Sequence, residues 1–293
     1  MLRGTASERF LFIKNHRSQW STPRLLNLLN VSKSGFYDWL NRKPSQRSQE
    51  RRQLWSKIEG MIQLSKGAIG YRQITKQLHE EGVVVSKGRV QRLLQQQRYR
   101  AVMSSRRYRR PKAGDSTLAV ANLLDRQFNP TRANEVWVSD ITQIRCREGW
   151  LYVCVIIDLY SRAVIGQSMG KMVDAKLVKR ALVSAKRFSG LSTLHQVLFH
   201  SDQGSQYSSV AIRGWLTRQG ATISQSRRGN CWDNACAESF FSLMKQQWIY
   251  PAGMMVMNQM KRLVQSYISN FYNTWRVHGT LNQVPMLCYK AAV

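Results

Sequence analysis

The sequence predicts an α/β domain with a mixed sheet and flanking helices, preceded by an all-α region. From about residue 134 onward, short apolar runs alternate with helical patterns, which is typical of a sheet with helices on its faces. Residues 20–97 instead show helical spacing and N-capping residues. The chain has 293 residues, of which 43% are hydrophobic. This is enough for a packed core and about two domains, or at most three.

Residues 20–41 have the pattern of a helix-turn-helix. A Ser-Thr pair before Pro23 begins a first helix, and Ser32 caps a second. Lys33 and Ser34 would lie at the exposed start of that second helix, where recognition helices contact DNA. A plain helical bundle is the alternative, because its helices carry the same spacing.

Residues 50–97 contain a second, similar helical unit. Apolar residues at helical spacing form its first helix, Gly70 opens another, and Ser86 caps a third. We predict DNA binding here too, with a plain helical bundle again as the alternative. The predicted domains are a helix-turn-helix over residues 1–45, a second helical domain over 46–97, a basic linker over 98–129, an α/β core over 130–250 and a C-terminal helical extension over 251–293.

The charge is strongly and unevenly basic. The formal net charge is +29, and residues 1–112 contribute +19 of it, from 25 Lys and Arg against 6 acids. A concentrated excess of this kind indicates a polyanionic partner, most commonly nucleic acid. Residues 98–112 contain seven basic residues, and we expect this run to contact phosphates. The arginines of its densest part are Arg106, Arg107, Arg109 and Arg110. A basic surface kept for solubility, or a solvated linker, is the alternative.

Cysteine usage and hydropathy predict a cytoplasmic, nucleoid-associated protein without a membrane segment. The five cysteines are odd in number and scattered, which favours reduced thiols over a disulfide framework. No stretch reaches the roughly 18 apolar residues that span a membrane. The apolar run at residues 10–13 is too short for a signal peptide.

The core is predicted to hold five strands, three of them consecutive in the chain. The strand of residues 149–158 is almost wholly apolar and is therefore expected to be central. The predicted strands cover residues 136–144, 149–158, 163–168, 197–201 and 221–224, and the predicted helices cover 174–188, 208–219, 234–248 and 255–277. Three adjacent strands followed by alternating helices and strands make a mixed sheet.

Three carboxylates are the candidate reactive groups. Asp140 interrupts an apolar strand, Asp202 ends another, and Glu238 lies in a predicted helix. A carboxylate in an apolar run is unfavourable unless it is paired, hydrogen-bonded or bound to metal. In a chain with 16 acids and 45 basic residues, these three indicate a divalent-metal site that acts on phosphates.

Each carboxylate also has an ordinary interpretation. Asp140 could pair with Arg145, Asp202 could be a turn residue, and Glu238 could lie on a helix surface. If the three do converge, their mutual repulsion should leave the metal-free site partly protonated or poorly ordered.

The motifs around these carboxylates resemble a known family. The matching stretches are residues 137–142, 157–162, 200–207, 226–234 and 237–241, followed by Tyr272, Asn273, Arg276, His278, Leu281 and Pro285. In this order they resemble the second-frame product of bacterial two-frame insertion-sequence transposases, which have a retroviral-integrase-like (RNase H-like) core. Asp202 and Glu238 are separated by 35 residues, the family's spacing.

The resemblance implies a specific chemistry. Asp140, Asp202 and Glu238 would be the catalytic triad that binds Mg²⁺ or Mn²⁺ in a two-metal site. An activated water would nick double-stranded DNA at the terminal inverted repeats, and the freed 3′-OH would attack the target DNA. The resemblance also implies a homo-oligomer on DNA, and a partner or frameshift fusion from the upstream frame. The alternatives are a DNA-binding regulator of transposition and a nuclease that cuts without joining.

Several other residues are secondary candidates. Arg227, Arg228, Lys245 and Arg276 are predicted phosphate contacts, each with a solvated charge as the alternative. Asp158 is predicted to be structural. His200 is expected to be a satisfied core histidine rather than a DNA or metal contact. The set Cys231, Cys236, His195 and His200 does not match zinc-ligand spacing.

Overall fold

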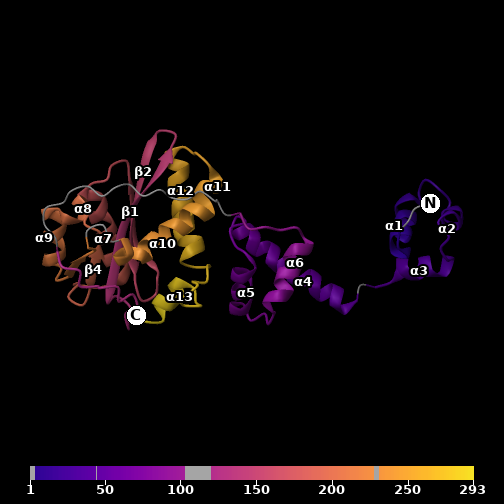
Figure 1. Cartoon of the computed structure of the whole chain (residues 1–293), viewed down its shortest axis with the longest axis horizontal. Helices are drawn as coiled ribbons and strands as arrows, with labels where there is room; N and C mark the ends of the chain where they lie inside the picture. The colour runs from indigo at the N-terminus through magenta and orange to yellow at the C-terminus, as the bar shows by residue number, and fades with distance from the viewer. Residues whose placement is uncertain (1–3, 44, 103–119, 228–230) are drawn as a thin grey trace. The chain divides into compact units, whose positions relative to one another are not determined.

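The computed structural model describes residues 4–43, 45–102, 120–227 and 231–293. The chain divides into two compact units, Met1–Ile58 and Glu59–Val293. Figure 1 shows both units and labels most of their helices and three of the strands named below. The first unit and the helices that begin the second form the all-α region, and the sheet lies in the second unit, as predicted.

The first unit contains α1 (Ala6–His16), α2 (Thr22–Leu28) and α3 (Lys33–Asn41), together with the first part of α4 (Gln46–Leu64). The predicted helix-turn-helix corresponds to α2 and α3, and the Ser32 hydroxyl caps α3 by accepting from the Gly35 amide at 3.1 Å. Helix α1 was not predicted. Its signal was a capping box, in which Thr5 and Glu8 bond each other's backbone amides. The helices enclose a small apolar core of Ile13, Leu25, Leu26, Leu29 and Phe36.

Helices α4 (Gln46–Leu64), α5 (Tyr71–Glu80) and α6 (Lys87–Gln96) form the predicted second helical region, and Ser86 caps α6 as expected. Within the second unit, α5 and the loop before it are joined to the C-terminal part of the chain. Gln73 donates to the Val277 carbonyl at 2.7 Å, and the Trp248 indole donates to the Ser65 carbonyl at 3.1 Å.

The sheet has five strands in the order β3-β2-β1-β4-β5. β1 and β2 pair antiparallel, as do β2 and β3, whereas β4 pairs parallel with both β1 and β5. This confirms the predicted mixed five-stranded sheet. The strands are β1 (Val136–Cys146), β2 (Gly149–Asp158), β3 (Val164–Gly170), β4 (Leu198–Ser201) and β5 (Thr222–Gln225).

One face of the sheet is covered by α7 (Ala175–Ser189), with α9 (Val210–Arg218) and α13 (Pro285–Lys290) in the same apolar cluster. Gly166 of β3 allows α7 to approach, because a Cβ there would lie 2.5 Å from the Ala181 carbonyl oxygen. The helix predicted over residues 208–219 corresponds to α9, and a four-residue helix that was not predicted, α8 (Ser205–Ser208), precedes it. Ser209 has extended backbone angles between them and caps the second.

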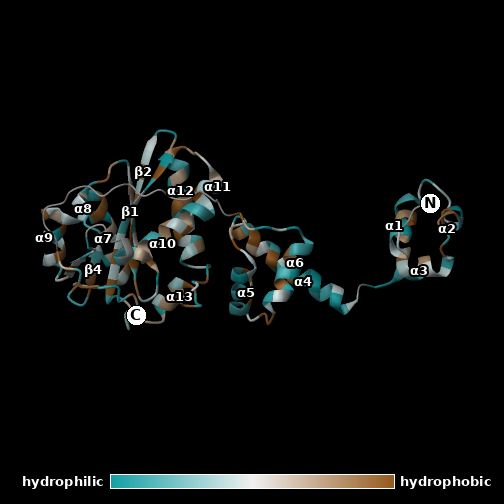
Figure 2. Cartoon of the chain, viewed as in Figure 1, coloured by the Kyte–Doolittle hydropathy of each residue, from teal (hydrophilic) through white to brown (hydrophobic). Residues whose placement is uncertain are grey.

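The other layer is formed by α10 (Ala235–Met244), η2 (Lys245–Ile249), α11 (Tyr250–Ala252), α12 (Met257–Ser266) and η3 (Tyr267–Tyr272). η2 and η3 are π-helical segments that continue α10 and α12. α10 packs against β1, and α12 packs against β2. Aromatic rings of this layer stack on one another, including those of Trp248, Tyr267 and Phe271. Figure 2 shows that α12 and its neighbours carry both hydrophobic and hydrophilic residues.

The helix predicted over residues 255–277 is shorter in the structure, where it runs from α12 through η3 and ends at Tyr272. Asn273 ends it, because its amide group bonds the backbone of Val164 in β3 through both its oxygen and its nitrogen. Among the helices of the described residues, none is both long and apolar enough to cross a membrane.

Candidate active site

The parallel pairing of β1 and β4 places Asp140 and Asp202 side by side. Val138 of β1 is in register with His200 of β4. Continued by two residues on each strand, this register sets Asp140 opposite Asp202, which directly follows β4. Neighbouring strands are about 4.8 Å apart, and residues two apart on a strand share a face. The two carboxylates therefore belong to one site.

Glu238 reaches the same site from α10, which packs on β1. The start of α10 is fixed to that strand by Asn234, whose side-chain amide donates to the Ser139 carbonyl at 3.0 Å. Ser139 directly precedes Asp140, and Glu238 lies one helical turn after Asn234. The structure thus brings all three sequence-predicted carboxylates to one place, on two strands and a helix.

The electrostatics of Asp140 are consistent with three neighbouring acids. The pKa of Asp140 is raised to about 8 from an ordinary 3.8, chiefly because the surrounding protein removes its hydration. Repulsion from Asp202 and Glu238 raises it further, whereas the Ile141 amide, which donates to Asp140 at 2.7 Å, lowers it. At neutral pH the metal-free site therefore holds a protonated Asp140, in line with the partial protonation that clustering predicts.

Asp202 is held at the end of β4 by a tight turn. The Gly204 amide donates to its carboxylate at 3.0 Å and lowers its pKa, but loss of hydration outweighs this bond and raises the pKa overall. The turn interpretation of Asp202 is therefore compatible with the active-site interpretation. The turn aims the carboxylate, and the strand register places it beside Asp140.

A buried lysine completes the electrostatics of the site. Lys245, the first residue of η2, is only 6% exposed, and burial lowers the pKa of its ammonium group. Attraction to Asp140 opposes that shift. Lys245 therefore supplies positive charge to the carboxylate cluster from inside the protein.

Two buried polar residues near the carboxylates, His200 and Asp158, are hydrogen-bonded within the protein. His200 is completely buried, with one ring nitrogen 2.9 Å from the Ser224 hydroxyl and the other 3.1 Å from the Ser226 hydroxyl. Burial lowers its pKa to about 4, so the ring is neutral at pH 7. Asp158 accepts from the amides of Asn134 and Ser161, as expected of a structural residue.

Three comparisons bear on the identity of this chain. Two family models described as integrase core domain match residues 130–231 and 219–285, and an HTH-like domain matches residues 49–108. The transposase InsF of insertion sequence IS3A from Escherichia coli (strain K12) is 35% identical over 274 residues, or 92% of this chain and 94% of that protein. The chain belongs to the IS3 family of DDE transposases.

A 31 kDa protein of insertion element IS600 from Shigella sonnei is 32% identical over 267 residues, covering 91% of the transposase described here and 97% of that protein. Among solved structures, the HTLV-2 integrase catalytic core domain in complex with magnesium is 15% identical, with a TM-score of 0.42. The alignment covers 54% of the transposase and 98% of that chain.

The remaining predicted DNA contacts of the transposase fall into three groups. Lys33 and Ser34 are exposed at the start of α3. Lys245 and Arg276 are buried, at 6% and 9% exposure. Lys245 lies near Asp140, and Arg276 lies near Tyr267 and Tyr272. Arg106, Arg107, Arg109, Arg110 and Arg228 lie outside the described residues. A role for each of these residues in binding DNA stays a prediction.

Sequence reasoning missed Asp233 as a site residue. Its carboxylate is 1% exposed and forms ion pairs with Arg227 and Arg126, both at 3.1 Å. These bonds lower its pKa to about 2. The available signal was the scarcity of acids, which should have marked an aspartate five residues before Glu238. The same ion pair gives the predicted phosphate contact Arg227 a partner within the protein.

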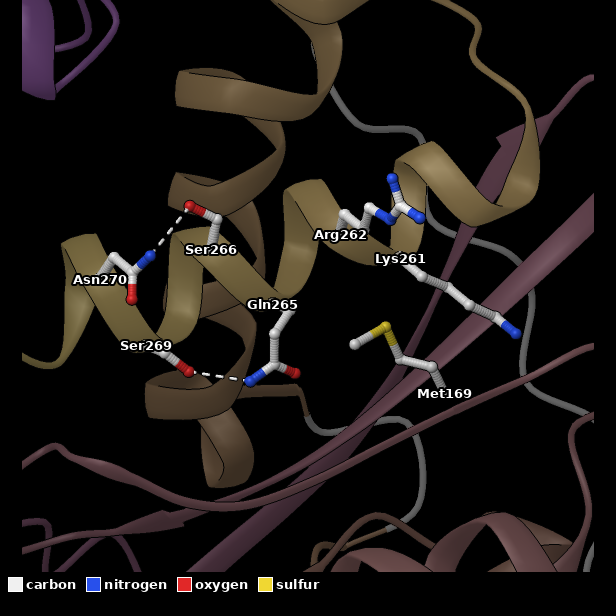
Figure 3. Close-up of a pocket in the computed structure, with 7 residues that line it drawn as sticks. All are labelled: Met169, Lys261, Arg262, Gln265, Ser266, Ser269 and Asn270. Atoms are coloured by element: carbon white, nitrogen blue, oxygen red, sulfur yellow. Dashed lines mark hydrogen bonds between the residues drawn. The ribbon is translucent and has the colours of Figure 1, made fainter.

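A surface pocket of the transposase lies away from the carboxylates. It is lined by Met169 of β3 and by side chains of α12 and η3, among them Lys261 and Arg262 (Figure 3). Gln265 donates to the Ser269 hydroxyl there at 2.9 Å. No acid lines this pocket, so it is separate from the Asp140 site.

Proposed function

We propose that this transposase cuts DNA at the ends of its insertion sequence and joins the freed 3′ ends to a second DNA, with Asp140, Asp202 and Glu238 as the catalytic acids. The convergence of these carboxylates carries the proposal. The pKa of Asp140 rises to about 8 partly because the other two lie close to it. A protein gains nothing in stability from this repulsion, so we attribute it to function.

The residues present fit divalent cations such as Mg²⁺ or Mn²⁺. The donors are carboxylate oxygens, which hard cations prefer. Two buried amide oxygens, of Asn234 and Gln225, have no hydrogen-bond partner among the described residues. Asn234 donates to the carbonyl of Ser139, the residue before Asp140, and Gln225 donates to the Asp202 carbonyl. They can accept from the water molecules that Mg²⁺ retains.

The carboxylates are near one another but not drawn together. Across the four described segments of the chain, no three His, Cys, Asp or Glu side chains lie close enough to hold a metal ion. Asp140, Asp202 and Glu238 are the residues that would hold the cations, and Asp140 would lose its proton when it does so.

Divalent cations bound there would polarise the scissile phosphate and activate the attacking oxygen. In the first step, water oxygen bonds to phosphorus and the 3′ oxygen leaves as a hydroxyl. In the second, that hydroxyl oxygen bonds to phosphorus in target DNA, and the displaced 3′ oxygen takes up a proton. The number of phosphodiester bonds is unchanged in the second step, so no energy-rich cofactor is needed.

One buried hydroxyl near the proposed site is poorly suited to form a covalent protein intermediate. Tyr207 is the hydroxyl residue packed beneath the site, and its oxygen lies 2.8 Å from the Ser139 hydroxyl. Burial raises its pKa well above 10, so it stays protonated and is a poor nucleophile. Water and the DNA 3′-OH are then the attacking groups.

Double-stranded DNA is the proposed partner. Relatives named as transposases of insertion sequences match more than nine-tenths of the chain. The net charge of +29 supports binding to a phosphate backbone. The HTH-like domain and the exposed start of α3 are the proposed DNA-reading elements. Assembly as a homo-oligomer and use of an upstream-frame product are proposed on family resemblance alone.

A plasmid carrying the gene with its native flanking DNA tests the proposal. Junction PCR would detect circles in which the two element ends are joined. We expect circles from the wild type and none from Glu238→Gln, which removes one carboxylate while keeping the side chain's size. Circles from both proteins would overturn the assignment of Glu238.

Absence of circles from either protein is resolved by adding the upstream frame. Circles that then appear only with wild-type Glu238 support the proposal and show that the upstream product is needed. If circles still fail to appear, specific DNA binding without cleavage would identify a regulator, and cleavage without joining would identify a nuclease.

A further inference from the structure

Asp233 and Asn234, the two residues before α10, form hydrogen bonds in different directions. Asp233 accepts from Asn122, Arg126 and Arg227, at 3.0 to 3.1 Å. Asn234 donates to the Ser139 carbonyl of β1 at 3.0 Å. Both residues are nearly inaccessible to solvent, at 1% and 3% exposure. We call this pair the α10 joint.

One side of the α10 joint is a short segment, residues 121–126, which we call the strap. In the sequence it follows the basic run of residues 98–112. The strap is fastened to β5, since the amides of Leu123 and Leu124 donate to the Ser224 hydroxyl at 2.9 and 3.2 Å. That hydroxyl also bonds His200, two residues before Asp202. The strap therefore connects to the strands beneath the catalytic carboxylates.

The other side of the α10 joint is the catalytic strand. Ser139, whose carbonyl accepts from Asn234, is the residue before Asp140. The amide orientation of Asn234 is fixed, because the reverse would set its oxygen against the Ser139 carbonyl oxygen. Glu238 follows one helical turn later and therefore moves as the start of α10 moves. Asn234 sets the distance between two members of the triad that come from different elements.

The charges favour a mechanical role for Asp233 over a phosphate site. Arg126 and Arg227 pair with Asp233, and Arg227 also lies 3.7 Å from Asp125. Two arginines and two aspartates leave the cluster neutral. A phosphate would have to compete with a buried carboxylate for the guanidinium groups, so the cluster holds the chain together instead of recruiting DNA.

We propose that the α10 joint positions Glu238 for catalysis, with Asn234 and Asp233 as positioning residues that fasten its helix to β1 and to the strap. This inference rests on the proposed function. Neither residue needs to touch DNA or a reacting atom. The joint acts by keeping Glu238 at its working distance from Asp140, as outer-sphere hydrogen bonds do for metal-site carboxylates.

The test separates chemistry from folding and from DNA binding. Purified variants would cut a DNA fragment carrying one native element end, under single-turnover conditions with saturating protein, and Mn²⁺ affinity would be measured by calorimetry without DNA. For Asn234→Ala we expect a cleavage rate about 10- to 100-fold lower, a Mn²⁺ affinity about ten-fold weaker and an unchanged DNA affinity. Asn234→Gln keeps the amide donor and should recover part of both losses.

Asp233→Asn should shift the same two quantities in the same direction. The pair Asn122→Ala and Arg126→Ala removes only the strap's bonds and should have a smaller effect. The matched control is Asp174→Ala, which removes a carboxylate cap from α7 on the opposite face of the sheet. It should lower thermal stability while leaving the cleavage rate and Mn²⁺ affinity unchanged.

Several results would overturn the inference. One is wild-type cleavage and Mn²⁺ binding by Asn234→Ala. Another is a loss of DNA affinity alone. A third is an equal loss of cleavage rate and Mn²⁺ affinity in Asp174→Ala, when the two variants have the same thermal stability. A failure of the proposed function gives a different result. Wild type and Glu238→Gln would then both fail to cleave DNA, so there would be no cleavage rate for Asn234→Ala to lower.

Discussion

Asp233 and Asp140 are both linked to the start of α10, yet the pKa values of their carboxyl groups shift in opposite directions. The pKa of Asp233 falls to about 2, because Arg227 and Arg126 donate to it. The pKa of Asp140 rises to about 8, because it has lost hydration and has acids for neighbours. The two pKa values differ because arginines surround Asp233 and other acids surround Asp140.

The comparison separates a carboxylate that stabilises the fold from one kept ready for chemistry. Asp233 receives its positive charge from the protein, so its site is complete as folded. Asp140 has Lys245 on one side but Asp202 and Glu238 on the other, so its site remains short of positive charge. A divalent cation would correct that deficit.

Loss of a triad carboxylate should have the largest effect. Asp202→Asn should lower DNA cleavage by more than the roughly 10- to 100-fold that loss of an outer-shell partner causes. DNA affinity and folding should be retained, because the side chain is near the surface and keeps its size. Cleavage assays with parallel gel-shift and circular dichroism measurements check this. Loss of binding and fold together would show that Asp202 is structural.

Asp140 should make the metal-free protein less stable as pH rises. The unfolded carboxyl ionises near pH 3.8 and the folded one near 8, so the folded state holds the extra proton between these values. Its stabilising contribution is complete below about pH 4 and is lost as pH rises towards 8. At pH 8, Asp140→Asn should be more stable than wild type by about 2 kcal/mol, less than the full shift implies because the side chain is partly exposed.

Thermal unfolding at pH 5 and pH 8, with and without Mg²⁺, measures this effect. Mg²⁺ should raise the wild-type melting temperature most at pH 8 and should do little for Asp140→Asn. A wild-type protein whose stability relative to Asp140→Asn does not change with pH would contradict the raised pKa of Asp140.

Asp233 should behave in the opposite sense. Its folded pKa lies below its unfolded value, so its contribution to stability is present above about pH 4 and is lost as pH falls towards 2. At pH 7, Asp233→Asn should lower the free energy of unfolding by about 1–2 kcal/mol, as expected for weakened hydrogen bonds to a charged group. Denaturant titrations should show the deficit shrinking as pH falls from about 4 towards 2.

The smallest expected effect concerns the basic run. Replacing Arg106 and Arg107 with Ala should weaken DNA binding modestly and reduce the slope of log affinity against log salt by about 2, because each phosphate that an arginine neutralises adds roughly one unit to that slope. Filter binding across a salt series measures the slope. An unchanged slope would show that these two arginines do not bind DNA phosphates.

The sequence allowed the sheet and the triad to be predicted because both leave local signals. Alternating apolar runs identified all five strands, and scarce acids in apolar runs identified Asp140 and Asp202. The scarcity of acids could have marked Asp233, but its partners left no such signal, since Asn122 and Arg126 are more than 100 residues away in the chain. Only the folded sheet brings them together.

Burial of charged residues was equally hard to foresee. Lysine and arginine usually lie on the surface. Lys245 and Arg276 are nevertheless enclosed by the π-helical turn of η2 and by the aromatic layer. The short helix α8 was also missed, because a four-residue helix is too short to show helical spacing of apolar residues.

Proton release on metal binding tests the contrast between the two aspartates most directly. Mn²⁺ would be titrated into the protein at pH 7 by calorimetry in two buffers of different ionisation enthalpy, for wild type, Asp140→Asn and Asp233→Asn. We predict release of nearly one proton from wild type and from Asp233→Asn, and clearly less from Asp140→Asn, because Asp140 holds most of the proton that the cation displaces. Binding by wild type without proton release would contradict this prediction.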